Sequence, residues 1–109
     1  MSLDVYLEAP RVVEVYERNI THNLGHMAEK AGLYEALWRP EEIEGFGGSA
    51  VELVPILLEG LAKLKADPEH FRQFEPDNGW GKYENLVDFV EFYLDACQAN
   101  PDATVRVSR

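Results

Sequence analysis

The chain has 109 residues, 46% of them hydrophobic and 11% aromatic, so it can bury a core of its own and does not belong to the disordered class. Twenty acidic and ten basic residues give a net charge of −10. This charge argues against general binding to nucleic acid or to an anionic membrane surface, because both depend on lysine and arginine. We expect one domain, spanning residues 1–109.

Three features of the sequence predict a cytoplasmic protein. The single cysteine, Cys97, cannot form an internal disulfide. No apolar run approaches the roughly 20 residues of a transmembrane helix. The start, MSLDVYLE, lacks the basic and apolar regions of a signal peptide.

Three segments have the two-residue period of a strand with one buried face. Apolar and polar side chains alternate in residues 2–8, and β-branched residues resume from Val12 after Pro10 and Arg11 interrupt the pattern. The tail, residues 103–108, alternates in the same way. We therefore expect an N-terminal hairpin and a third strand at the C-terminus.

Helical patterns fill the chain between the second and third strands. One helix is expected to begin near Thr21 and to end near Gly32, and a shorter one follows at residues 34–38, where Pro40 ends it. A short turn follows Asp67, and a last helix spans about residues 82–99 with Cys97 on its buried face.

A third long helix is predicted to begin after Ser49. Ser49 and Glu52 have the spacing of a capping box, and the apolar stripe that follows runs to about Ala66. We expect this helix to be the most buried one. Pro55 predicts a kink, or a first turn that is separate from the main helix.

This order of elements predicts an α+β domain. Its small antiparallel sheet would contain three strands, two from the N-terminus and one from the C-terminus. Three to four helices would cover one face of the sheet.

The segment Thr21-His22-Asn23 is the first candidate for a binding site. At the start of a helix, free backbone N–H groups favour an anion, while histidine and asparagine side chains offer directed hydrogen bonds. Alternatively, Thr21 only caps the helix and its two neighbours bond to nearby backbone.

The loop Asn78-Gly79-Trp80-Gly81 is the second candidate. Flanking glycines allow close approach of a ligand to the backbone, and the indole of Trp80 can stack on a flat group. Trp38 and Arg39 could add a second ring and a positive charge. The alternative is that both tryptophans close the ends of the core.

Support for catalysis or metal binding is weaker. His22, His26 and Glu29 would share one face of a regular helix and could bind zinc or manganese, but no further ligand completes a local motif. Cys97 is predicted to be buried and therefore inert. A general base such as His22 has no partner that its spacing identifies. We expect no metal and no cofactor.

Two long segments, residues 19–42 and 78–109, resemble a family of small uncharacterised proteins of phage and bacterial genomes. The recurrent words of that family match THN at residues 21–23, LWRP at residues 37–40, Tyr34 and NGWG at residues 78–81. His26 matches a variable position, which counts against a metal pair with His22. The resemblance implies no activity, although a phage-type role in sequestration or in countering host defence would fit it.

The leading hypothesis is a small soluble binding protein, and not an enzyme, whose pocket takes a polar small molecule of anionic or nucleotide-like character. We expect no direct binding to nucleic acid or membrane. The predicted ligand-binding residues are Thr21, His22, Asn23, Trp38, Arg39, Gly79, Trp80 and Gly81.

Two alternatives belong to other classes. The chain could be an acidic inhibitor that covers a basic protein surface with the carboxylates of its last helix and of residues 41–44. It could also be a His22-dependent hydrolase or metalloenzyme.

Overall fold

The computed structural model describes residues 1–9 and 13–109, so the predicted interruption at Pro10 and Arg11 and the resumption at Val12 lie outside the described residues. Strands β1 (Ser2–Ala9), β2 (Val13–Thr21) and β3 (Thr104–Ser108) form one antiparallel sheet in the order β2-β1-β3. Both the hairpin and the third strand are confirmed.

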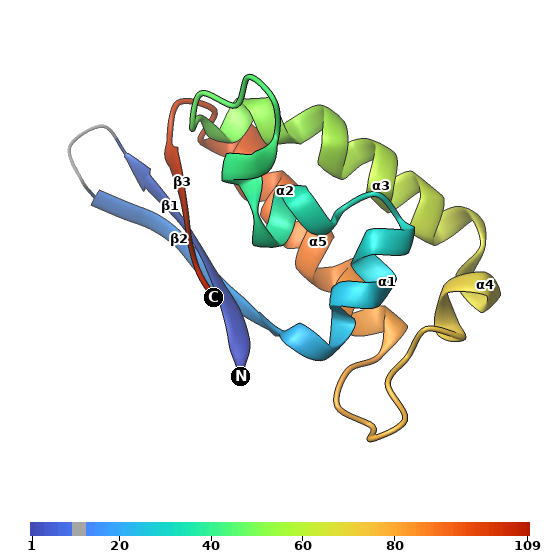
Figure 1. Ribbon diagram of the computed structural model, residues 1–109. Coiled ribbons are helices and arrows are strands. Elements are labelled where there is room, and N and C mark those ends of the chain that lie inside the picture. The colour runs from blue at the N-terminus through green and yellow to red at the C-terminus, as the bar shows by residue number, and fades with distance from the viewer. Residues whose placement is uncertain (10–12) are drawn as a thin grey trace.

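Five α-helices of the described chain lie over one face of this sheet (Figure 1). The α+β class is therefore confirmed, and the helices outnumber the predicted three to four because two segments of five residues count separately. The helices are α1 (Gly25–Lys30), α2 (Tyr34–Trp38), α3 (Val54–Ala66), α4 (Pro68–Arg72) and α5 (Tyr83–Ala99).

The alternation predicted for β1 separates a buried face from a polar one. Leu3, Val5 and Leu7 are fully buried against the helices. On the opposite face, the guanidinium of Arg106 lies 4.0 Å from the centre of the Tyr6 ring and pairs with Glu8 at 3.2 Å. One apolar face is enough here because the helices cover only that side of the sheet.

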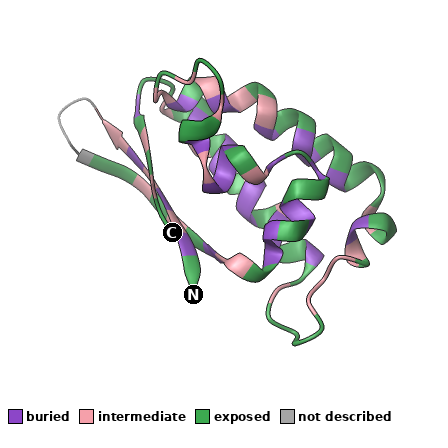
Figure 2. Ribbon diagram, in the orientation of Figure 1, coloured by how far each residue is buried: buried purple, intermediate pink, exposed green. Residues whose placement is uncertain are grey.

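Helix α5 is the most buried helix, and the expectation that α3 would be is wrong. The described core takes seven residues of α5 and three of α3, and Leu58 of α3 is 47% exposed. The reason is position: α5 contacts both β2 and α3, whereas α3 lies farther from the sheet and keeps one face in solvent (Figures 1 and 2). In the described residues, no helix has the length and apolar character that a bilayer crossing requires.

The chain before α3 follows the capping-box prediction. A 3₁₀ turn at Ala50–Leu53 precedes α3, and Pro55 occupies its first turn, so the separate first turn predicted from Pro55 is confirmed. The Glu52 carboxylate accepts hydrogen bonds from the backbone N–H groups of Gly47, at 2.7 Å, and Ser49, at 2.8 Å. These two bonds hold the glycine-rich loop against the start of the helix.

The loop at residues 47–49 is expected to loosen in acid. The two backbone N–H donors stabilise the charged form of Glu52 and lower the pKa of its carboxyl group. Stabilisation by Glu52 is therefore complete above the ordinary glutamate pKa and is lost as the pH falls through the lowered pKa of the folded state. Amide chemical shifts of Gly47 and Ser49 followed by NMR should titrate with that lowered pKa. Glu52→Gln should abolish the titration; unchanged titration in this variant would contradict the assignment.

Cys97 is expected to be unreactive in the folded protein. Its side chain is fully buried in α5, and burial raises the pKa of the thiol to about 12. A disulfide reagent at pH 8 should modify the folded protein only at the rate of its opening, and the unfolded protein at once. Rapid stoichiometric labelling without denaturant would contradict this burial.

Candidate functional site

Two adjoining hollows lie where the end of β2 meets the loop before α5. They share Asn19, Thr21 and Trp80. The larger, called here the His22 hollow, has a volume of about 590 Å³ and is lined by Met1, Ser2, Asn19, Thr21, His22, Asn23 and Trp80. The smaller, called here the Asp88 hollow, has a volume of about 260 Å³ and is lined by Arg18, Asn19, Ile20, Thr21, Trp80, Gly81, Asn85, Asp88 and Phe89.

Trp80 stands on a loop that is fixed at its base while the ring stays exposed. The backbone N–H of Trp80 donates to Asn78 Oδ1 at 2.9 Å, and both flanking glycines have positive φ, +75° at Gly79 and +127° at Gly81. A Cβ on Gly81 would lie only 2.9 Å from Leu24 Cγ. The loop therefore packs closely on the turn after β2, and the Trp80 side chain remains 71% exposed between the two hollows.

The His22 ring is fixed by a hydrogen bond from Trp38, on the side that faces the core. The indole N–H of Trp38 donates to His22 Nδ1 at 2.6 Å, and the Trp38 ring stacks on Tyr34 with centroids 5.4 Å apart. Because Nδ1 accepts this bond, the ring proton of neutral His22 lies on Nε2, which remains as its donor. Trp38 is only 2% exposed, so it supports the site from the core and offers no stacking surface. The alternative stated for Trp38, a tryptophan that closes the core, is the one observed.

Thr21 caps a shorter and tighter turn than predicted. It is the last residue of β2, paired with Ser2, and its hydroxyl accepts from the Asn23 N–H at 3.3 Å. The backbone then forms a 3₁₀ turn at His22–Leu24 before the six residues of α1, so the regular helix expected from Thr21 is absent. So short a helix gives little dipole, which removes the main reason for expecting an anion at this point. The end at Gly32, with φ of +75°, agrees with the prediction.

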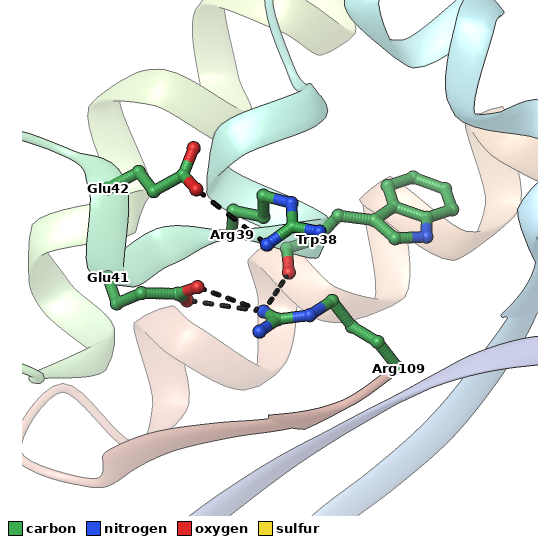
Figure 3. A network of polar contacts seen from close by, with 5 residues as sticks. All are labelled: Trp38, Arg39, Glu41, Glu42 and Arg109. Carbon is green, nitrogen blue, oxygen red and sulfur yellow. Dashed lines mark hydrogen bonds and ion pairs between the residues drawn. The ribbon is translucent and has the colours of Figure 1, made fainter.

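Arg39 lines neither hollow. Its Nη1 lies 3.7 Å from a carboxylate oxygen of Glu42, at the end of α2, while the Trp38 indole points away from this pair (Figure 3). Arg109 lies on the same side, where it donates to the Trp38 carbonyl at 2.8 Å and to Glu41 at 3.0 Å. The arginine that does line a hollow is Arg18, whose guanidinium lies 4.5 Å from the centre of the Phe92 ring.

The three segments predicted to form one pocket thus converge in part. Thr21, His22, Asn23 and Trp80 line the larger hollow, and Gly81 lines the smaller. Gly79 lines neither hollow, although it provides one of the two positive φ angles of the loop. No protein-family model, curated protein or solved structure matches this chain.

The two histidines considered as metal ligands have different neighbours. The His22 ring faces Trp38, and the His26 ring lies 5.2 Å from that of Phe74. The 3₁₀ turn also breaks the regular spacing on which the shared face depended. Across residues 1–9 and 13–109, no group of three or more His, Cys, Asp or Glu side chains could hold a metal ion.

Sequence reasoning missed Asn85 and Asp88, the polar side chains that α5 contributes to the Asp88 hollow. Asn85 and Asp88 lie three residues apart on α5. Their spacing places them on one side of a helix. The sequence contains no signal that this side faces the end of β2 and not open solvent.

Proposed function

We propose that this chain is a binding protein for a planar, polar small molecule of the nucleotide-like class, which stacks on Trp80. The supporting observation is an indole exposed at 71% between two hollows, on a loop that glycine geometry and a hydrogen bond hold in place. An exposed aromatic ring of this kind binds flat groups through stacking. Around it lie directed polar groups, among them the Asn19 amide and His22 Nε2, and Arg18 supplies a positive charge for an anionic part of the ligand.

The test is a calorimetric titration of the protein with AMP, GMP, CMP and UMP, repeated on Trp80→Ala and Trp80→Phe. Loss of stacking should weaken binding of the preferred nucleotide by about tenfold or more in Trp80→Ala, since stacking contributes about 1–3 kcal/mol per base. Trp80→Phe should retain most of the affinity. Equal affinity in all three proteins, or no binding by any of the four nucleotides, would contradict the proposal.

A second candidate function has its own supporting surface. A groove of about 550 Å³ lies between α2, the loop at residues 42–44 and α3, and its lining includes Glu35, Glu42, Glu44 and Glu59 against a single lysine, Lys63. Its apolar lining includes Ile43 and Ile56. Such a groove suits a basic segment of a partner protein, as expected of an acidic inhibitor. Within the groove, Glu42 pairs with Arg39 and Glu59 with Lys63, so Glu35 and Glu44 are the carboxylates best placed to meet a basic partner.

The two candidates predict opposite responses to substitution. If the groove is the functional surface, partner binding should weaken steeply with salt and in the Glu35→Gln/Glu44→Gln variant, and it should be unaffected by Trp80→Ala. If the Trp80 site is the functional surface, Trp80→Ala should weaken binding by about tenfold or more, and the glutamine variant should leave it unchanged.

A further inference from the structure

We infer that the Asp88 hollow recognises a guanine ring, so that the ligand class of the Trp80 site is a guanine nucleotide. This inference rests on the proposed function, because it assumes that the ring stacks on Trp80. It follows from the hydrogen-bonding groups that α5 presents beside Trp80 and from the one cation in the lining of the same hollow.

Asn85 offers the NH₂ group of its side-chain amide to a ligand in this hollow. Its Oδ1 accepts the backbone N–H of Lys82 at 2.9 Å, which caps α5. The side-chain amide therefore keeps its NH₂ group, with two N–H donors, for a partner outside the helix. The cap also fixes the orientation of the amide, so the identity of the available group is set by the fold.

Asp88 supplies the complementary acceptor. An ionised carboxylate accepts through two oxygens and donates nothing. The neighbouring carboxylates of α5 are engaged, Glu84 by Arg72 at 2.6 Å and Glu91 by Lys65 at 2.6 Å. Asp88, in contrast, is exposed and lines the hollow together with Asn85 and Trp80.

A donor beside a two-oxygen acceptor matches the pairing edge of guanine. That edge has one acceptor, O6, followed by the N1–H and N2–H donors, so the Asn85 amide meets O6 while Asp88 takes both N–H groups. Xanthine has a carbonyl oxygen where guanine has its N2 amine. This oxygen would face the Asp88 carboxylate, and two acceptors cannot form a hydrogen bond with each other. Hypoxanthine lacks the second donor, and adenine presents one amine and one acceptor.

The remaining lining groups suit the rest of a nucleotide. Ile20 and Phe89, both almost fully buried, give the hollow an apolar floor for the ring. Arg18 lines the hollow from β2, and its guanidinium lies over the Phe92 ring. A phosphate group would be attracted by this guanidinium and repelled by Asp88, so the two charges give the bound nucleotide one orientation.

The test is a competition titration with GMP, IMP, XMP and AMP on the whole chain, on Asp88→Asn and on the matched control Asp95→Asn. Asp95 is an exposed aspartate of the same helix that lines neither hollow. The protein and the control should prefer GMP over XMP by about tenfold or more, since an unmatched buried polar group costs about 1–3 kcal/mol. Asp88→Asn should reverse this preference in favour of XMP.

A second variant keeps the test decisive if Asp88→Asn folds poorly. Asn85→Asp retains the oxygen that accepts the Lys82 N–H but removes both N–H donors. The variant should therefore bind GMP about tenfold more weakly. Trp80-dependent binding without preference among the four nucleotides, or with the same preference in Asp88→Asn, would overturn the guanine assignment and leave the proposed function intact. Failure of all four nucleotides to bind would overturn the guanine assignment, and it would overturn the proposed function as well if CMP and UMP also failed to bind.

Discussion

Gly81→Ala is expected to destabilise the fold by about 2–4 kcal/mol and to displace the Trp80 loop. The backbone of Gly81 has φ of +127°, a conformation that costs residues with a Cβ about 1–3 kcal/mol. The new methyl group would also lie 2.9 Å from Leu24 Cγ and 3.1 Å from Thr21 Cγ2, and overpacking of this kind costs about 1–3 kcal/mol. Leu24 is fully buried, so it cannot move aside.

Gly79→Ala is the matched control, because it adds the same methyl group two residues away. Its φ is also positive, +75°, but nothing lies within 4 Å of the added Cβ. Gly79→Ala should lower folding stability by only about 1–2 kcal/mol, the cost of a positive φ for a residue with a Cβ. Urea denaturation of both variants measures the difference. Equal losses of stability would show that the contact between the loop and the Leu24 turn contributes nothing.

The parts of the fold that sequence predicts well are those in which local chemistry and burial agree. Residues 2–8 alternate and form β1, and the capping-box pair at Ser49 and Glu52 starts a helical segment. The relative burial of α3 and α5 was missed for a different reason. Both helices have apolar stripes, and only the sheet topology, which brings α5 against β2 as well as α3, decides which one lies deeper.

The same distinction applies to the candidate site. The exposed Trp80 between two glycines is a local feature that the sequence predicts, whereas the two hollows beside it depend on β2 and α5 meeting the loop in the fold. Trp38 and Arg39 are adjacent in sequence, yet α2 directs the indole into the core toward His22 and leaves the guanidinium beside Glu42. Because Trp38 and Arg39 are neighbours in sequence, we expected them to share one site, but their side chains point in different directions from α2. Asp88 is the opposite case, because it lies far from β2 in sequence but lines a hollow together with β2 residues in the folded chain.

Trp38→Phe is expected to weaken the Trp80 site although Trp38 lines neither hollow. The variant keeps an aromatic ring against Tyr34 but removes the N–H that His22 Nδ1 accepts at 2.6 Å. The histidine ring then loses the bond that fixes its orientation and its proton position. We expect a loss of folding stability of about 1–3 kcal/mol, compared with about 3–5 kcal/mol for Trp38→Ala, which also empties the core. Ligand affinity should fall several-fold in Trp38→Phe.

A double-mutant cycle separates this hydrogen bond from packing. His22→Ala is introduced into the original chain and into Trp38→Phe, and the free energy of unfolding is measured for all four proteins. If the indole–imidazole bond contributes, the two losses should fall short of additivity by about 0.5–3 kcal/mol. Additive losses would mean that Trp38 supports the site by packing alone. Trp38→Phe also leaves Trp80 as the only tryptophan, so its fluorescence reports ligand stacking directly in the same protein.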